Sequence, residues 1–213
     1  MFRSWAILTP RNEEAQELNK DVLARFPGVL TSYLSIDTVD FGADAEGTGE
    51  VPPVEVLNAF QPASLPPSQL QLKVGAPIIL LRNLSPKNGM CNGTRLCVTR
   101  LGRRCIQARI LGGDFDGQEW LIPRIELQSS PDEHAFIVRR TQFPVRLCFA
   151  MTINKAQGQS FDVVGVDLRL PVFSHGQLYV ALSRVTNVHN IAVLSQGERV
   201  TNIVWPEVLL ESG

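Results

Sequence analysis

The sequence predicts an α/β domain that is interrupted by a small antiparallel β-barrel. Near the N-terminus, an apolar run typical of a buried strand is followed at once by helical spacing. Between residues 69 and 127 the chain is a series of short β runs separated by turns, and from Phe143 strands and helices alternate again. We therefore expect residues 1–60 and 143–213 to form the α/β domain, with the barrel at 61–142 inserted into it.

The first strand and helix are predicted from their spacing. Residues 5–9 are a short apolar run, and the apolar residues that follow recur at helical intervals. Thr9 is expected to cap this helix, with Pro10 at its first position and Glu13 at the positive end of its dipole. The remaining elements expected in this domain are strands at 33–39, 144–151, 163–168 and 190–195, and helices at 54–60, 176–185 and 203–210.

The β module is predicted from its turn signals. Its strand-like runs are separated by short Gly- and Asn-containing segments, which are typical of hairpin turns. The tract LGGDFDGQ at 111–118 is interpreted in the same way, as a hairpin turn. The four turn signals are 87–89, 92–93, 112–113 and 116–117.

Composition indicates a folded chain and excludes several classes of protein. The 213 residues are 44% hydrophobic and 19% charged, which is ordinary for a globular protein. The longest apolar stretch, 76–81, is too short to span a bilayer, so no membrane partner is expected. The N-terminus lacks the apolar core of a secretory signal and begins almost inside a strand, so the chain is interpreted as a truncated product or a gene fragment. The four cysteines lack C-x-x-C spacing, so no metal site is expected.

The net charge of −1 conceals an uneven distribution of charge. Residues 56–113 contain eight basic and no acidic residues, and residues 135–161 contain four basic and no acidic residues. Such runs suit a surface that faces phosphates. The alternative is that these bases find acidic partners elsewhere in the fold.

Two segments carry the residue types of a nucleotide or nucleic-acid site. TINKAQGQSFDVVGVDL, residues 152–168, follows a predicted strand with a turn rich in hydrogen-bond donors. Loops at strand ends are where α/β folds bind ligands. GQLYVALSRVTN, residues 176–187, puts Arg184 late on a predicted helix, where it could reach a γ-phosphate as an arginine finger.

These segments together resemble the PIF family of DNA helicases, especially its Helitron-encoded branch. Residues 7–19 resemble its motif IV, residues 149–168 its motif V and residues 175–187 its motif VI, in the family's order. Residues 72–96 and 119–127 resemble its inserted barrel, which is similar to a Src-homology-three fold. The resemblance implies the second RecA-like domain of a superfamily-one helicase, which moves 5′ to 3′ on single-stranded DNA.

The resemblance also implies roles for individual residues. Arg184 would be the arginine finger; the alternative is an ordinary cation at a helix end. Gly158 could equally be a turn glycine, and Lys155 a solvated lysine. The residues expected near the nucleotide are Gln157, Gly158 and Gln159. Those expected near the DNA backbone are Asn12, Thr152, Asn154 and Lys155.

The sequence lacks the phosphate-binding loop of such an enzyme. No G-x-x-x-x-G-K-S/T pattern occurs, and that loop holds the β- and γ-phosphates and magnesium. We therefore expect the ligands of ATP and Mg²⁺ to lie mostly on a separate N-terminal RecA-like domain, and this chain alone to be inactive. Single-stranded DNA is the expected partner, in the nucleus or alternatively the mitochondrion. Two other readings remain open: a non-catalytic nucleic-acid-binding module, and a decayed transposon-derived fragment.

Overall fold

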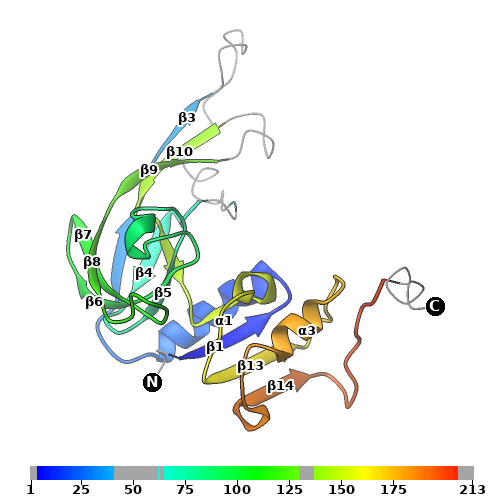
Figure 1. Cartoon of the computed structure of the whole chain (residues 1–213). Helices are drawn as coiled ribbons and strands as arrows, with labels where there is room; N and C mark the ends of the chain where they lie inside the picture. The colour runs from blue at the N-terminus through cyan, green and yellow to red at the C-terminus, as the bar shows by residue number, and fades with distance from the viewer. Residues whose placement is uncertain (1–3, 41–61, 63–64, 130–136, 206–213) are drawn as a thin grey trace, which may run out of the picture. The chain divides into compact units, whose positions relative to one another are not determined.

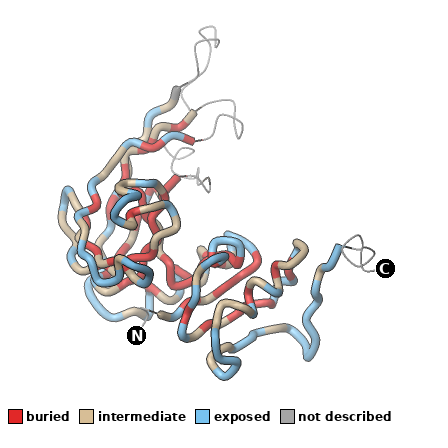
Figure 2. The backbone as a smooth tube through the Cα atoms, viewed as in Figure 1, coloured by how far each residue is buried: buried red, intermediate tan, exposed pale blue. Residues whose placement is uncertain are grey.

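The computed structural model describes residues 4–40, 62, 65–129 and 137–205 (Figure 1). The chain divides into two compact units, which are described separately. Unit 1 comprises residues 1–25 and 148–213, and unit 2 comprises residues 26–147. Both units contain stretches of buried residues (Figure 2). No described helix is long and apolar enough to cross a membrane.

Unit 1 contains a four-stranded sheet in which every pair of neighbouring strands is parallel. The predicted strand at 5–9 is confirmed and lies between two others in the sheet. Its register pairs Thr9 with Thr152, the last residues of the two adjacent strands. The strands, in sheet order, are β12 (Ala150–Thr152), β1 (Trp5–Thr9), β13 (Val163–Leu168) and β14 (Ile191–Ser195).

Helix α1 (Asn12–Arg25) packs against β12 and β1. It begins later than the sequence predicted, because Thr9 is still part of β1 and is fully buried there. The Thr9 hydroxyl donates to the carbonyl of Arg11 at 2.8 Å instead of capping the helix. Pro10 therefore precedes the helix, whereas Glu13 does lie in its first turn, as expected.

Asn19 fastens the edge strand β12 to α1. Its amide nitrogen donates to the carbonyl of Ala150 at 2.7 Å, and its amide oxygen accepts from the Ala150 N–H at 2.9 Å. The side chain is buried, so these two bonds satisfy backbone groups that would otherwise be left unpaired on the outer edge of the sheet.

The other elements of unit 1 follow β12 and β13. The helix predicted at 176–185 is shorter in the structure than in the prediction, because the observed helix, α3, spans Gln177–Leu182. Of the helix predicted at 203–210, residues 203–205 are not helical and the rest lie outside the described residues. The elements are the 3₁₀ helix η3 (Ile153–Ala156), α3 (Gln177–Leu182) and the 3₁₀ helix η4 (Val188–Asn190).

Unit 2 is built of antiparallel strands, as the sequence predicted. Its largest sheet has five strands, and the described pairings leave β11 (Val145–Leu147) and β8 (Glu119–Pro123) at its two edges. Closure into a barrel therefore stays a prediction. The predicted turn at 87–89 is a short 3₁₀ helix, η1 (Pro86–Asn88), followed by Gly89 in the left-handed region. The strands, in sheet order, are β11 (Val145–Leu147), β5 (Pro77–Leu80), β6 (Arg95–Leu101), β7 (Cys105–Ile110) and β8 (Glu119–Pro123).

Two smaller sheets complete unit 2. The single strand expected at 33–39 is two strands, because Ser35 interrupts it and donates its N–H to the carbonyl of Ser68. Side chains of the sheet that pairs residues 31–34 with residues 69–72 are part of the buried core of the five-stranded sheet. One small sheet pairs β2 (Thr31–Leu34) with β4 (Gln69–Leu72), and the other has the order β3 (Ile36–Asp40), β10 (Ile137–Gln142) and β9 (Ile125–Gln128).

The compact units have different limits from the domains expected at 60 and 143. Residues 31–40 pair with strands of the β module, so unit 2 begins at Phe26. The run 144–151, expected as one strand, is split between units at Cys148, because β11 pairs with β5 and β12 with β1. Apolar patterning is similar in both halves of that run, so it did not mark the division. The helix expected at 54–60 lies outside the described residues.

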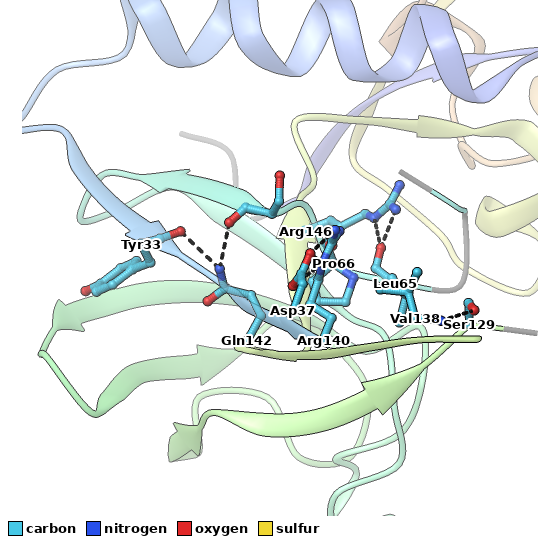
Figure 3. Close-up of polar contacts among 10 residues, drawn as sticks. Tyr33, Asp37, Leu65, Pro66, Ser129, Val138, Arg140, Gln142 and Arg146 are labelled. Carbon is cyan, nitrogen blue, oxygen red and sulfur yellow. Dashed lines mark hydrogen bonds and ion pairs between the residues drawn. The ribbon is translucent and has the colours of Figure 1, made fainter. Parts of the chain in front are cut away.

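A buried polar network connects the segment around Leu65 to strands β3, β10 and β11 (Figure 3). Arg140 is fully buried and forms a 2.6 Å ion pair with Asp37, and it also donates to the carbonyl of Pro66. Arg146 donates to the carbonyl of Leu65, and burial together with the charge of Arg140 lowers the pKa of Arg146. These side chains satisfy backbone carbonyls of Leu65 and Pro66, which lie outside the described strands.

Replacing Asn19 by leucine keeps the side-chain volume but removes both hydrogen bonds to Ala150. The buried N–H and C=O of Ala150 would lose their partners, so we expect the free energy of unfolding to fall by about 2–4 kcal/mol. Urea denaturation followed by circular dichroism measures this change. Lys20→Ala, at the exposed neighbouring position, is the control and should shift stability by less than about 0.5 kcal/mol. Equal stability of the two variants would show that Asn19 does not fasten β12.

Candidate nucleic-acid interface

A polar pocket lies in unit 1 where β1 and β12 end. It has a volume of about 540 Å³. Three of the four residues expected near a DNA backbone line it, and the fourth, Lys155, is exposed on η3 and is not part of the lining. The pocket is lined by Pro10, Arg11, Asn12, Glu13, Thr152, Asn154 and Phe173.

The strand register brings these residues together. Because Thr9 pairs with Thr152 in two parallel strands, the segments that leave the strands start at the same edge of the sheet. One segment leads through Pro10 into α1, and the other leads into η3. Residues about 140 positions apart in the sequence thus line one pocket.

The pocket offers unused hydrogen-bonding groups. Thr152 is only 6% exposed, and its hydroxyl forms no hydrogen bond within the described part of the chain. The backbone N–H groups in the first turn of α1 lack partners in the helix, and the helix dipole makes that end positive. Glu13 is the acidic residue in the lining and opposes an anion on its side of the pocket. An anion is therefore best accommodated between Thr152 and Asn154.

Gln177 connects the three segments of the pocket and was not identified from the sequence. Its side chain is 2% exposed, and its amide nitrogen donates to the carbonyl of Pro10 at 3.3 Å and to Oδ1 of Asn154 at 3.4 Å. Its amide oxygen accepts from the N–H of Phe173 at 3.0 Å. The residue lies within the segment HGQLYVALSRVTN, but a glutamine in a helical pattern gives no sign that it will be buried.

Phe173 and Arg11 were also missed. The guanidinium carbon of Arg11 lies over the Phe173 ring, 5.9 Å from its centroid, which is the geometry of a cation–π contact. The ring is nevertheless 54% exposed. A single aromatic residue in the loop between β13 and α3 has no periodicity that would mark it.

The residues expected near a nucleotide form the turn after η3. Gly158 has φ +77°, and a Cβ added there would meet no atom within 4 Å. The left-handed backbone conformation therefore favours glycine at this position, whether or not a nucleotide also approaches it. Gln159 donates its amide nitrogen to the carbonyl of Lys155, while Gln157 is exposed. Their role toward a nucleotide stays a prediction.

Arg184 lies two residues beyond the end of α3, not late on the helix as expected. Its half-buried guanidinium donates to the carbonyl of Val180 at 2.8 Å and to the carbonyl of Gln159 at 2.9 Å. It also donates to the hydroxyl of Ser183 at 2.8 Å. Arg184 thus ties the end of α3 to the turn that contains Gly158.

Several bases in the two acid-free stretches are buried or paired with an acid. Arg140 is buried against Asp37, and Arg109 pairs with Glu119 at 2.9 Å. Both acidic partners come from outside the acid-free stretches. For these two arginines, the alternative that the bases find acidic partners elsewhere in the fold is therefore confirmed. Two further bases of the first stretch, Lys73 and Arg95, are buried. The bases of that stretch that are exposed are Lys87, Arg100, Arg103 and Arg104.

Among the described residues, no group of three histidine, cysteine, aspartate or glutamate side chains lies together as metal ligands would. The hydrogen bond from Arg169 lowers the pKa of Asp167, despite the burial of that carboxylate. Asp167 therefore remains ionised at neutral pH and is committed to Arg169.

The parallel sheet of unit 1, interrupted in sequence by an antiparallel β unit, is shared with RecA-like helicase domains of solved structure. Comparison with solved structures agrees. The chain matches a crystal structure of Pif1 helicase from Bacteroides in complex with ADP-AlF3 and ssDNA, with a TM-score of 0.67 and 25% identity. The match covers 97% of this chain and 43% of that one. Pif1 helicase from Candida albicans matches with a TM-score of 0.66, 24% identity and coverage of 90% and 45%.

Sequence comparison identifies the family. Residues 55–101 match the family described as DNA helicase Pif1, 2B domain. The ATP-dependent DNA helicase PIF1 of Homo sapiens is 37% identical over 139 residues, which is 62% of this chain and 20% of that protein. The Danio rerio protein of the same name is 29% identical over 199 residues, 91% of this chain and 28% of that protein. The chain belongs to the PIF helicase family and corresponds to the C-terminal portion of its members. It spans about a quarter of the length of these relatives.

Replacing Gln177 by leucine tests whether it holds the pocket together. The variant keeps a buried side chain of similar size but leaves the Phe173 N–H and the Pro10 carbonyl without their partner, so we expect a loss of about 1–3 kcal/mol in the free energy of unfolding. Gln196→Leu makes the same change at an exposed position of unit 1 and should be close to neutral. Urea denaturation of both variants measures the difference. Equal stability would mean that the three segments are positioned without Gln177.

Proposed function

We propose that this chain is the part of an ATP-dependent, 5′-to-3′ DNA helicase that grips single-stranded DNA and closes over the nucleotide. The observation that carries the proposal is the pocket at the ends of β1 and β12, which gathers Asn12, Thr152 and Asn154. Relatives named as ATP-dependent DNA helicases, and a Pif1 structure bound to ssDNA, support it. Such a protein would act in the nucleus, or alternatively in the mitochondrion.

The chemistry of the pocket suits a phosphodiester. A phosphate between Thr152 and Asn154 could accept from a hydroxyl and an amide that face the same space. The positive end of α1 and the charge of Arg11 add favourable electrostatics. Lys155, exposed next to the pocket on η3, would contact a neighbouring phosphate. These contacts are made to the phosphate backbone of the DNA, so the binding would be independent of base sequence.

The proposed nucleotide role rests on the turn 157–159 and Arg184. In this proposal Gln157, Gly158 and Gln159 approach ATP, and Arg184 exchanges a carbonyl partner for the γ-phosphate when a first RecA-like domain presents it. In this proposal the ligands of magnesium lie mostly on that first domain, together with the phosphate-binding loop. Unit 2 would be an inserted barrel of Src-homology-three type, in agreement with the 2B match at 55–101.

Binding to single-stranded DNA should be measurable on this chain and should weaken as salt is added, because phosphate contacts release counterions. Thr152→Val removes the pocket hydroxyl at nearly constant volume, and we expect about a tenfold weaker affinity, the effect of losing one hydrogen bond to a charged group. Lys155→Ala should weaken binding without changing base preference. Fluorescence anisotropy with a labelled oligothymidylate measures each affinity.

Thr99→Val is the matched control for this measurement. Its hydroxyl is buried in unit 2 and has no hydrogen-bond partner among the residues that the structure describes, so the same chemical change should leave DNA affinity unchanged. The proposal fails if the parent chain does not bind at low salt, or if its affinity is independent of salt. Failure to bind in a correctly folded chain would favour the decayed-fragment reading.

Arg184 should affect turnover only together with a first RecA-like domain. The chain alone should show no ATPase activity above background, whereas a fusion to that domain from a relative should hydrolyse ATP in a DNA-stimulated reaction. Arg184→Ala in the fusion should lower kcat by about a thousandfold, and Arg184→Lys should rescue it poorly, because an ammonium cannot replace the planar fork. Steady-state assays measure kcat.

Because Arg184 also holds the end of α3, the variants need a test of folding. Circular dichroism and nucleotide affinity should change much less than kcat, since a finger acts on charge that develops in the transition state. A fall in kcat that only follows a loss of folded protein would assign Arg184 a structural role. Hydrolysis by the unfused chain would reveal a phosphate site elsewhere in it.

A further inference from the structure

Phe173 is an exposed aromatic ring in the wall of a polar pocket. It is the aromatic residue among the pocket's lining residues, and 54% of it is accessible. The preceding residue, Val172, is buried at 3% exposure, so the chain turns from the core to the surface at this point. Exposing a phenyl ring to water is unfavourable, and an aromatic surface next to polar groups is the usual composition of a ligand site.

Two contacts restrict Phe173, one to its backbone and one to its ring. The N–H of Phe173 donates to the buried amide of Gln177 at 3.0 Å, which fixes its backbone. The Arg11 guanidinium lies over the ring, 5.9 Å from its centroid, yet more than half of the residue stays accessible. A ring that is fixed before binding loses little conformational entropy when a ligand stacks on it.

We propose that Phe173 is a stacking platform for a nucleobase of the bound strand, with Arg11 supporting the ring. This inference rests on the proposed function, which assigns the phosphates to Thr152 and Asn154 in the same pocket. A phenyl face cannot bind a phosphate, but it stacks on any base, because every base has a π-face. The pocket volume of about 540 Å³ lies within the range of small-molecule sites. The pocket thus recognises a nucleotide unit, not the backbone alone.

The test compares two oligonucleotides that have the same phosphate backbone. One is oligothymidylate, and the other has the same length but carries abasic tetrahydrofuran residues in place of the nucleosides. The parent chain should bind the thymidylate about fivefold to a hundredfold more tightly, the effect of one stacked base. Phe173→Ala and Phe173→Leu should lose most of this preference, while their affinity for the abasic strand stays unchanged. Phe173→Tyr should retain the preference.

Tyr179→Ala is the matched control. Tyr179 is 75% exposed on α3 in the same unit but does not line the pocket, so its removal should leave both affinities unchanged. Phe173→Leu keeps an apolar side chain without a π-face, which separates stacking from local packing if the alanine variant folds poorly.

The outcomes separate this inference from the function on which it rests. If neither oligonucleotide binds the parent chain, the proposed function fails and the platform fails with it. If both bind the parent equally well, the function stands and the platform is wrong. If Phe173→Leu weakens both strands by the same factor, the ring shapes the pocket without contacting a base. Only a loss of preference confined to the Phe173 variants supports the platform.

Discussion

The parallel pairing of β1 with β12 is the constraint on which the site depends. Its register aligns Thr9 with Thr152, so that both strands end at one edge of the sheet. At that edge β1 leads into α1 and β12 leads into η3, and residues of these two connecting segments line the pocket. A shift of the register by one residue would turn the buried Thr152 to the opposite face and separate it from Asn12.

That pairing is made between strands far apart in the chain. All of unit 2 lies in sequence between α1 and β12, so the short β12 strand returns to the sheet only after a long excursion. β12 is three residues long and lies at the edge of the sheet, where backbone pairing on one side is all that the sheet provides. Asn19 supplies the missing bonds from α1, and Gln177 then joins the segments that follow each strand. Two buried side-chain amides thus supply hydrogen bonds to backbone groups that strand pairing does not satisfy.

Buried polar contacts account for part of the uneven charge distribution. Arg140 and Arg146 lie in a run without acids, yet both are used to hold the segment around Leu65 within unit 2. Arg184, the residue with the most specific proposed role, is bonded to carbonyls of its own unit. A nucleotide that binds Arg184 must therefore replace these hydrogen bonds. A role of Arg184 as an arginine finger would thus depend on the turn that contains Gly158.

The sequence by itself determined the family, the α/β class, the strand at 5–9 and the antiparallel nature of the β module, because these depend on local periodicity, turn residues and motif order. It also named Asn12, Thr152 and Asn154, which the structure brings together. Only the tertiary structure decided the limits of the units, the division of 144–151 between two sheets, and the roles of Gln177 and Phe173 in the pocket. Those features depend on which distant backbone a strand pairs with and which side chains it buries. Neither leaves a pattern in the neighbouring residues.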